Sequence, residues 1–515
     1  MSSPRRTAAA LALAAAIVAA TGCSAQSPDA PSRTGAAPQV FTLALNADPG
    51  SLDPHASPLG VVQQLALFLY DPLIHRNGDD FSSGLADKWS QDGKVVRFHI
   101  RPGVTCADGK PLTAETVAAN LNYVADPKNG SPLADLTVPA GSKATADAAA
   151  SEVELVTPEP AAFVLHGLAN LPIVCDRGLA DRELLTQGAD GSGPYVLDSS
   201  VAGSSYNLSL RPGYGWGPGG ATTDTAGLPA KVTVNVVTNE TTTANLLLNG
   251  GVHAGVVAGP DVRRLQEAKL TRYSTQSVYG ELFFNQSAGS PVRSQAVRRG
   301  LVQALNLTEL MTVATSGLGF APERLTGSSP CKQPTVPGNL PAQDVAAAKE
   351  ALAPLRGKEL TMRYMSKLGP AAAAAVQLAV EQWAAAGVTV KAHGETDAQL
   401  LTSVFQSGNF DIAWVPIDGQ NPAQTRGYFS GPPPAKGGGN FAQIGNDAYD
   451  EAAAKAAALP GAAGCDLWAK ADSALVSAAD VVPFANVDYS TWSPASVSFE
   501  TGYYGVLPLS IRMRA

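Results

Sequence analysis

The second half of the chain, from Val292 to Pro416, alternates between two hydrophobic patterns. Apolar residues three and four positions apart predict amphipathic helices, and apolar residues at every second position predict half-buried strands. The helical pattern occurs at 297–305, 345–352, 376–383 and 398–406, and the strand pattern at 360–364, 388–390 and 410–415. Helices that alternate with strands indicate a largely parallel sheet with helices on its faces. This part of the chain is therefore predicted to form an α/β lobe.

The first half of the chain mixes the two patterns less regularly. Alternating strands are predicted at 41–45, 95–100, 153–156, 206–210 and 232–237, and a buried helix at 61–70. Thr113 precedes another helical stretch, and its side chain can accept a hydrogen bond from an amide three residues further on. We expect a mixed lobe that becomes rich in strands after Gly191.

The N-terminus has the features of a bacterial export signal. Arg5 and Arg6 precede an apolar stretch at 7–20, which is too short to span a bilayer comfortably. The stretch ends at Ala20-Thr21-Gly22-Cys23, which resembles a lipobox, so we expect a signal peptide at 1–22 and lipid attachment at Cys23. Residues 23–38 are small and polar and predict a flexible tether. The alternative is an ordinary signal peptide in which Cys23 is incidental.

Composition narrows the class of function. The chain has 515 residues, a formal net charge of −8 and only 16% charged residues. Nucleic-acid binding needs clustered Lys and Arg, so a nucleic-acid partner is not expected. After the N-terminus there is no run of 18 apolar residues that would predict a membrane span.

Four cysteines besides Cys23 are expected to form two disulfides, because an even number in an exported chain favours pairing. Three pairings are possible from the sequence. Cys106–Cys175 and Cys331–Cys465 are favoured because the change of pattern divides the chain into lobes between Cys175 and Cys331. The alternative is free buried thiols.

No catalytic or metal-binding motif is recognised, so neither an enzyme nor a cofactor is expected. The six histidines lack the spacing of metal ligands, and no P-loop or G-x-S-x-G motif occurs. Gly215-x-Gly217-x-x-Gly220 matches a dinucleotide fingerprint formally, but it does not lead from a strand into a helix.

The best candidate for ligand binding is the loop that follows the strand at 410–415. In open α/β sheets, ligands bind beyond the carboxyl ends of the strands. Asp418 can hold a ligand ammonium there and Trp414 can form an apolar wall, with Ile417 and Gly419 beside them. The alternatives are an Asp-Gly turn and a core tryptophan.

A series of short motifs carries a family resemblance. They are Ser51-Leu52-Asp53-Pro54, Leu69-Tyr70-Asp71-Pro72-Leu73, Leu85-Ala86-Asp87-Lys88-Trp89, 98–104 (FHIRPGV), 108–117 (DGKPLTAETV), Gly193-Pro194-Tyr195, Phe284-Asn285, 297–301 (VRRGL) and Gly408-Asn409-Phe410-Asp411-Ile412. In this order they resemble the peptide-type extracellular solute-binding proteins of ABC importers (family 5). The resemblance covers nearly all of the chain after residue 38.

The resemblance implies the two-lobed periplasmic-binding-protein fold (type II-like, cluster C) in α/β architecture. The first lobe would be large and discontinuous, built from 39–284 and the returning segment 484–515, and 285–483 would form the second lobe. A hinge would join the two lobes, and closure around the ligand would capture it without covalent chemistry.

The resemblance also implies a site and partners. Asp418 would pair with the α-ammonium of an oligopeptide or dipeptide, and Ser57, Pro58 and Leu59 would line the cleft from the first lobe. The arginine that some members carry before this aspartate is absent, since Ile412 and Ala413 occupy that region.

The expected partners are an ABC permease and its ATPase. The protein would act as a monomer outside the cytoplasmic membrane, anchored by Cys23. Alternatives are another solute (haem, siderophore, metal chelate or sugar), a non-transport lipoprotein of envelope assembly, or a secreted hydrolase.

Overall fold

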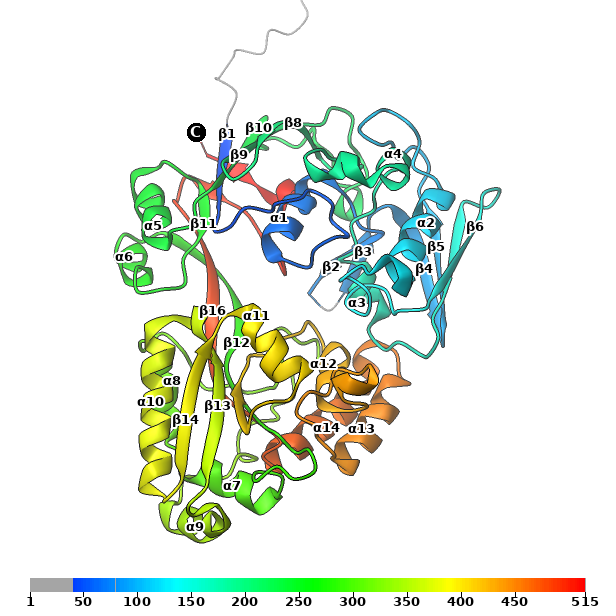
Figure 1. Cartoon of the computed structure of the whole chain (residues 1–515). Helices are drawn as coiled ribbons and strands as arrows, with labels where there is room; N and C mark the ends of the chain where they lie inside the picture. The colour runs from blue at the N-terminus through cyan, green and yellow to red at the C-terminus, as the bar shows by residue number, and fades with distance from the viewer. Residues whose placement is uncertain (1–39, 79, 515) are drawn as a thin grey trace, which may run out of the picture. The chain divides into compact units, whose positions relative to one another are not determined.

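A ten-stranded mixed sheet connects the two halves of the chain in the computed structural model, which describes residues 40–78 and 80–514 (Figure 1). Its strands, in spatial order, are β14 (Thr389–Glu395), β13 (Glu359–Met365), β15 (Ile412–Trp414), β12 (Thr271–Phe284), β16 (Val481–Ser493), β11 (Ala254–Val256), β1 (Val40–Leu45), β10 (Lys231–Val236), β9 (Ser205–Leu210) and β8 (Tyr195–Val201). The predicted signal peptide, the tether and Cys23 lie outside the described residues.

Two long antiparallel strands, β12 and β16, carry the sheet from one lobe to the other (Figure 1). At one end β16 pairs with β11 through Thr491 and Trp492, and at the other end β12 pairs with β15 from Leu282 to Phe284. The register between β12 and β16 shifts around Gly280. A Cβ at this glycine would lie 2.5 Å from the Phe484 ring, so only glycine allows this close approach.

The first lobe surrounds the half of the sheet that contains β1. Its second sheet has the order β4-β5-β7-β6. Its further elements are α1 (Gly60–Leu69), β2 (Ile74–Asn77), β3 (Asp80–Ser83), β4 (Ala86–Asp92), β5 (Val95–Ile100), α2 (Ala114–Ala125), β6 (Lys143–Asp147), β7 (Glu152–Val156), α3 (Val164–Leu168), α4 (Asp176–Ala180), α5 (Glu240–Asn249) and α6 (Val262–Glu267).

The C-terminal segment packs into the core of the first lobe. Val497, Phe499 and Ile511 are buried in the same cluster as Phe41 and Val232. The segment forms the short strands β17 (Val497–Ser498), β18 (Thr501–Gly502), β19 (Gly505–Val506) and β20 (Arg512–Met513). The first lobe is therefore assembled from two parts of the chain.

The second lobe has the predicted alternation of helices and strands. Trp383 of α10 (Gly369–Ala385) is fully buried, and its indole N–H donates to the Leu301 carbonyl of α7 (Gln295–Gln303) at 2.9 Å. Instead of one helix at 398–406, the chain forms α11 and then a π-helical turn at Leu401–Gln406. The helices are α7 (Gln295–Gln303), α8 (Leu307–Ala314), α9 (Val345–Ala351), α10 (Gly369–Ala385), α11 (Asp397–Leu400), α12 (Pro422–Phe429), α13 (Asp447–Ala457) and α14 (Cys465–Ser477).

Two disulfides join the favoured cysteine pairs. Cys106 is bonded to Cys175 in the first lobe, and Cys331 is bonded to Cys465 in the second. Each pair therefore closes a loop within a single lobe, so neither disulfide links the two lobes covalently.

A buried ion pair connects α7 to the turn before β16. The Arg298 guanidinium lies 2.6 Å from the Asp480 carboxylate, and the two side chains are only 5% and 2% exposed. Gln286 and Asn446 also donate to Asp480, at 2.9 and 2.8 Å. The carboxylate thus has partners on both of its oxygens, as a buried charge requires.

Replacing Arg298 with methionine is expected to lower the free energy of unfolding by about 3 kcal/mol, because Asp480 would remain buried without its cation. Urea unfolding measures the loss. The R298M/D480N double variant should recover part of it, since it removes both charges. Arg299, which is half-buried and donates to the Ser477 carbonyl, offers the control. R299M should lose less than about 1 kcal/mol, and an equal loss in both single variants would contradict the prediction.

Among residues 40–78 and 80–514, no helix combines the length and the apolar character needed to cross a membrane.

Candidate functional site

The loop between β15 and α12 places Asp418 at the carboxyl end of a central strand. β15 lies between β13, its parallel neighbour, and β12. The loop ends at Asn421, whose side chain caps α12 by accepting hydrogen bonds from the amides of Ala423 and Gln424 at 3.1 and 3.2 Å. The strand and the capped helix therefore hold the loop at both ends.

Four donors surround the Asp418 carboxylate. It accepts hydrogen bonds from the Ser277 hydroxyl at 3.1 Å and from the backbone amides of Val278, Gly327 and Gly419 at 3.2, 3.2 and 2.9 Å. None of these donors carries a formal charge. The negative charge of Asp418 is thus oriented by the protein but not neutralised by a cation among these partners.

Asp418 is an exposed residue whose carboxylate is nevertheless crowded by protein atoms. Burial of the carboxyl group raises the pKa of Asp418, and the hydrogen bonds from Gly327, Val278, Gly419 and Ser277 act in the opposite direction. An ammonium near this carboxylate would stabilise its charged form.

Glu281 supports the same loop from the hinge strand β12. Its side chain is fully buried, and one carboxyl oxygen accepts a hydrogen bond from the Ile417 amide at 2.8 Å. The other oxygen has no hydrogen-bond partner within the described part of the chain. Burial raises the pKa of Glu281 well above its ordinary value, and the nearby charges of Asp418 and Asp472 raise it further. Glu281 thus holds the backbone amide of Ile417, next to Asp418. Because its pKa is raised, Glu281 readily keeps its proton.

Trp414 is a core residue. This burial does not support the expectation that Trp414 forms an apolar wall of the ligand site. It is 1% exposed, its indole N–H donates to the Tyr279 carbonyl at 2.8 Å, and its ring packs against Phe484. Ile417 and Gly419 are also buried. These three residues hold the loop in place. Of the four residues predicted for this region, Asp418 is the exposed one.

Ser57, Pro58 and Leu59 lie immediately before α1 on the first lobe. Leu59 is 60% exposed, and its amide donates to the Ser57 hydroxyl at 3.2 Å. A single exposed apolar side chain is common on protein surfaces, so the exposure of Leu59 does not by itself assign it to a ligand site. Within the described residues, no hydrogen bond joins this segment to the Asp418 loop.

A hairpin from the C-terminal segment lies next to α1. Gln64 of α1 donates to the Val506 carbonyl at 3.1 Å and accepts from the Val506 amide at 2.7 Å. This anchors the turn between β18 and β19, at which Tyr503 is 42% exposed. Burial raises the pKa of Tyr503 to about 12, and the negative charge of Asp418 contributes to the rise. The hairpin of the first lobe therefore lies within electrostatic reach of the second-lobe carboxylate.

The residues that hold Asp418 were not predicted from the sequence. Asp418 is far in the chain from Ser277, Val278 and Gly327. The pattern of polar and apolar residues around Glu281 does not distinguish it from any other strand residue. The register of β12 against β15 brings them to the loop, and a single sequence does not report that register.

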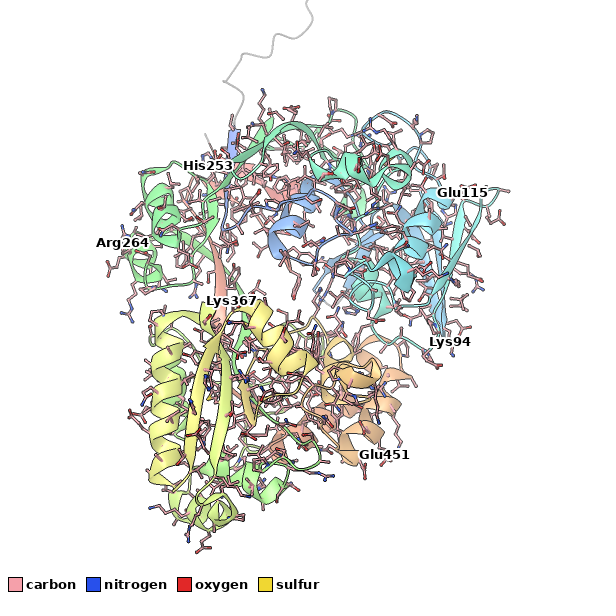
Figure 2. All side chains as sticks on the ribbon, in the orientation of Figure 1. Lys94, Glu115, His253, Arg264, Lys367 and Glu451 are labelled. Atoms are coloured by element: carbon pink, nitrogen blue, oxygen red, sulfur yellow. A yellow bond between two sulfur atoms is a disulfide. The ribbon has the colours of Figure 1, made fainter. Side chains whose placement is uncertain are left out.

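Two of the histidines form hydrogen bonds with backbone groups. His253 (Figure 2) accepts a hydrogen bond from the Thr42 amide at 3.0 Å, and His55 donates to the Pro172 carbonyl at 2.8 Å. Among residues 40–78 and 80–514, no cluster of three or more His, Cys, Asp or Glu side chains is arranged to hold a metal ion.

Comparison with protein families gives a match over most of the chain. The profile of the family described as "Bacterial extracellular solute-binding proteins, family 5 Middle" matches residues 80–436.

Curated relatives from Escherichia coli (strain K12) match over shorter segments. The probable deoxycholate-binding periplasmic protein YgiS is 36% identical over 21% of this chain and 21% of its own length. The nickel-binding periplasmic protein is 26% identical over 55% of this chain and 54% of its own length. The probable D,D-dipeptide-binding periplasmic protein DdpA is 28% identical over 34% and 36%. The chain thus spans between one fifth and about half of the length of these three relatives.

Solved structures match over nearly the whole chain. A substrate-binding protein from Microbacterium hydrocarbonoxydans, complexed with 4-hydroxybenzoate hydrazide, is 25% identical with a TM-score of 0.74, covering 92% of this chain and 100% of that one. A dipeptide-binding protein from Pseudoalteromonas sp. SM9913, in complex with Met-Leu, is 18% identical with a TM-score of 0.73, covering 92% and 100%. These similarities establish the two-lobed periplasmic-binding-protein fold.

Proposed function

Because the chain belongs to the bacterial extracellular solute-binding proteins of family 5, we propose that it captures short peptides by their free amino end. The observation that carries the proposal is the Asp418 carboxylate, which belongs to an exposed residue at a strand exit and is held by four uncharged donors. A peptide ammonium would supply the charge that these partners lack. The peptide would be bound and released without chemical change.

Peptides are the favoured solute class for two reasons. One relative is named as a probable D,D-dipeptide-binding periplasmic protein. A carboxylate that is not neutralised by its own partners also suits a cationic ligand end. The relatives named for nickel and deoxycholate indicate the wider range of the family.

Capture would proceed by closure of the two lobes about β12 and β16. We place the crossing between the lobes at the register shift around Gly280, slightly before the boundary at 284/285 expected from the sequence. Phe284 pairs with Ile412 and packs in the second-lobe core, so it moves with that lobe. A ligand that contacts both lobes only when they are closed shifts the equilibrium toward the closed state.

Binding of a defined peptide pool tests the function. The pool contains all tripeptides of Ala, Leu, Met and Phe with free termini, and native mass spectrometry of the protein with the pool identifies the members that bind. Calorimetry with the strongest-binding member then gives its affinity. We expect at least one micromolar complex whose peptide is recovered intact. A protein that binds no member, or that cleaves the bound peptide, would overturn the proposal.

Delivery to an ABC permease and anchoring through Cys23 complete the proposed function. Two acyl chains on the N-terminal cysteine hold a protein stably at a membrane. Replacing Cys23 with serine is therefore expected to move the protein from the membrane fraction to the medium, which immunoblotting of fractionated cells measures. Ser24→Ala, a neighbouring change that leaves the cysteine intact, should keep the protein in the membrane fraction. Retention of the C23S variant in that fraction would contradict the anchor.

A further inference from the structure

A short segment of the first lobe, Ala162-Phe163, is buried in the core of the second lobe. The two residues lie between β7 and α3, and both are almost completely buried. They belong to the hydrophobic cluster of the second lobe that also contains Phe429. Their neighbours Ala161 and Val164 pack instead in the core of the first lobe. The chain therefore leaves one core at Ala162 and returns to it directly after Phe163.

The segment is fixed from both lobes. The Gly461 amide, in the short turn before α14 of the second lobe, donates to the Ala162 carbonyl at 2.6 Å. From the first lobe, the His166 ring packs edge to face against the Phe163 ring, with their centroids 5.3 Å apart. His166 belongs to α3, which begins directly after Phe163, so this helix orients the phenylalanine ring toward the second lobe.

The loop of the candidate site takes part in the same contact between the lobes. The Asn170 side chain donates to the Gln420 side chain at 2.7 Å, and the Gln424 side chain donates to the Leu136 carbonyl at 2.8 Å. Gln420 lies two residues after Asp418, and Gln424 lies on α12. The contact lies apart from β12 and β16 (Figure 1), so the lobes are joined at a second place besides these strands.

These contacts favour the closed arrangement of the lobes without help from a ligand. All of them join protein groups to protein groups. If the lobes separated here, the Phe163 side chain would leave the second-lobe core. Burial of a phenylalanine side chain changes an equilibrium constant by about 10- to 100-fold, so separation is disfavoured by a comparable factor.

We propose that Ala162-Phe163 is a latch that holds the two lobes together before a ligand binds. This inference goes beyond the proposed function, because it concerns the empty protein and is the same for any class of solute. Ligand entry requires the latch to release. A bound ligand then adds its contacts to a closed state that the latch already favours. The latch therefore slows entry and lowers the free energy that the ligand must supply for closure.

Distances between two spin labels test the latch in the unliganded protein. The labels are attached at Glu115→Cys on α2 and Glu451→Cys on α13, two exposed positions on different lobes (Figure 2). The C23S chain is used, because its other four cysteines are bonded in disulfides. Native mass spectrometry selects preparations that carry no bound solute.

Double electron–electron resonance should give one dominant short distance when the latch is intact. Phe163→Ala should lower the ratio of short to long distances about 10- to 100-fold, because it removes the buried ring. A dominant long distance in the protein with Phe163 intact would overturn the proposal, and so would an unchanged distribution in F163A.

Leu165→Ala is the matched control, because it removes an apolar side chain of α3 that packs against the first-lobe core. It should leave the distribution unchanged, and a shift equal to that of F163A would refute the role of Phe163. If F163A does not fold, the N170A/Q424A variant decides. It removes two hydrogen bonds between the lobes and should lower the ratio about 10-fold, whereas an unchanged ratio would refute the latch. No peptide is added, so the result does not depend on whether the protein binds peptides.

Discussion

Replacing Asp418 with asparagine is expected to weaken binding of the strongest-binding tripeptide about 100-fold, or about 3 kcal/mol. The substitution keeps the size of the side chain but removes the charge that would face the peptide ammonium. It also places an amide among the four donors from Ser277, Val278, Gly327 and Gly419, where a carboxylate accepts all the hydrogen bonds. Calorimetry with the free tripeptide measures the loss.

Two controls separate charge recognition from a general disturbance of the lobe. Asp397 is an exposed carboxylate of the same lobe, paired with Lys367 on the surface, so D397N should bind the tripeptide normally. The N-acetylated tripeptide lacks the ammonium, so it should bind weakly and equally to the unaltered protein and to D418N. Unchanged affinity of D418N for the free tripeptide would remove Asp418 from the proposed site.

Removing the Cys331–Cys465 disulfide is expected to lower the free energy of unfolding by about 5 kcal/mol. The bond closes a loop with a sequence separation of 134 residues, and cross-links that close long loops restrict the unfolded chain most. Both cysteines also lie in the second-lobe core, where Trp468 and Phe441 are fully or almost fully buried. Urea unfolding of the C331S/C465S variant, compared with the unaltered protein under oxidising conditions, measures the effect.

The first-lobe disulfide provides the comparison. Cys106–Cys175 has a sequence separation of 69 residues, so C106S/C175S should lose about 4 kcal/mol, slightly less than the other variant. Because the two bonds lie in different lobes, each variant should unfold its own lobe first if the lobes unfold separately. A loss below about 1 kcal/mol for C331S/C465S would show that the bond contributes little to the stability of the folded chain.

Local patterns in the sequence determine much of the second lobe. The stripe of Val376, Ala379 and Trp383 becomes the buried face of α10, and the alternation of Leu360 and Met362 becomes β13. Capping is equally local, since Asp344, directly before α9, accepts a hydrogen bond from the Ala347 amide at 3.0 Å. These features follow from sequence because they depend on residues only a few positions apart.

The exit loop after β15 was also found from the sequence, because a strand followed by a turn-rich segment is a local signal. Trp414 shows the limit of that signal. Its position near the strand end fits either a ligand wall or a core residue, and only its packing against Phe484 and its hydrogen bond to Tyr279 decide for the core.

The tertiary structure alone decided the surroundings of the candidate site. β12 begins with alternating polar residues that do not stand out as a long strand, yet its pairing with β16 joins the lobes and brings Ser277 and Glu281 to the Asp418 loop. The contact of α12 with a segment near Leu136 likewise joins parts of the chain that are far apart in sequence. Contacts between segments so distant in the chain depend on strand register and lobe packing. The local sequence pattern carries no record of either.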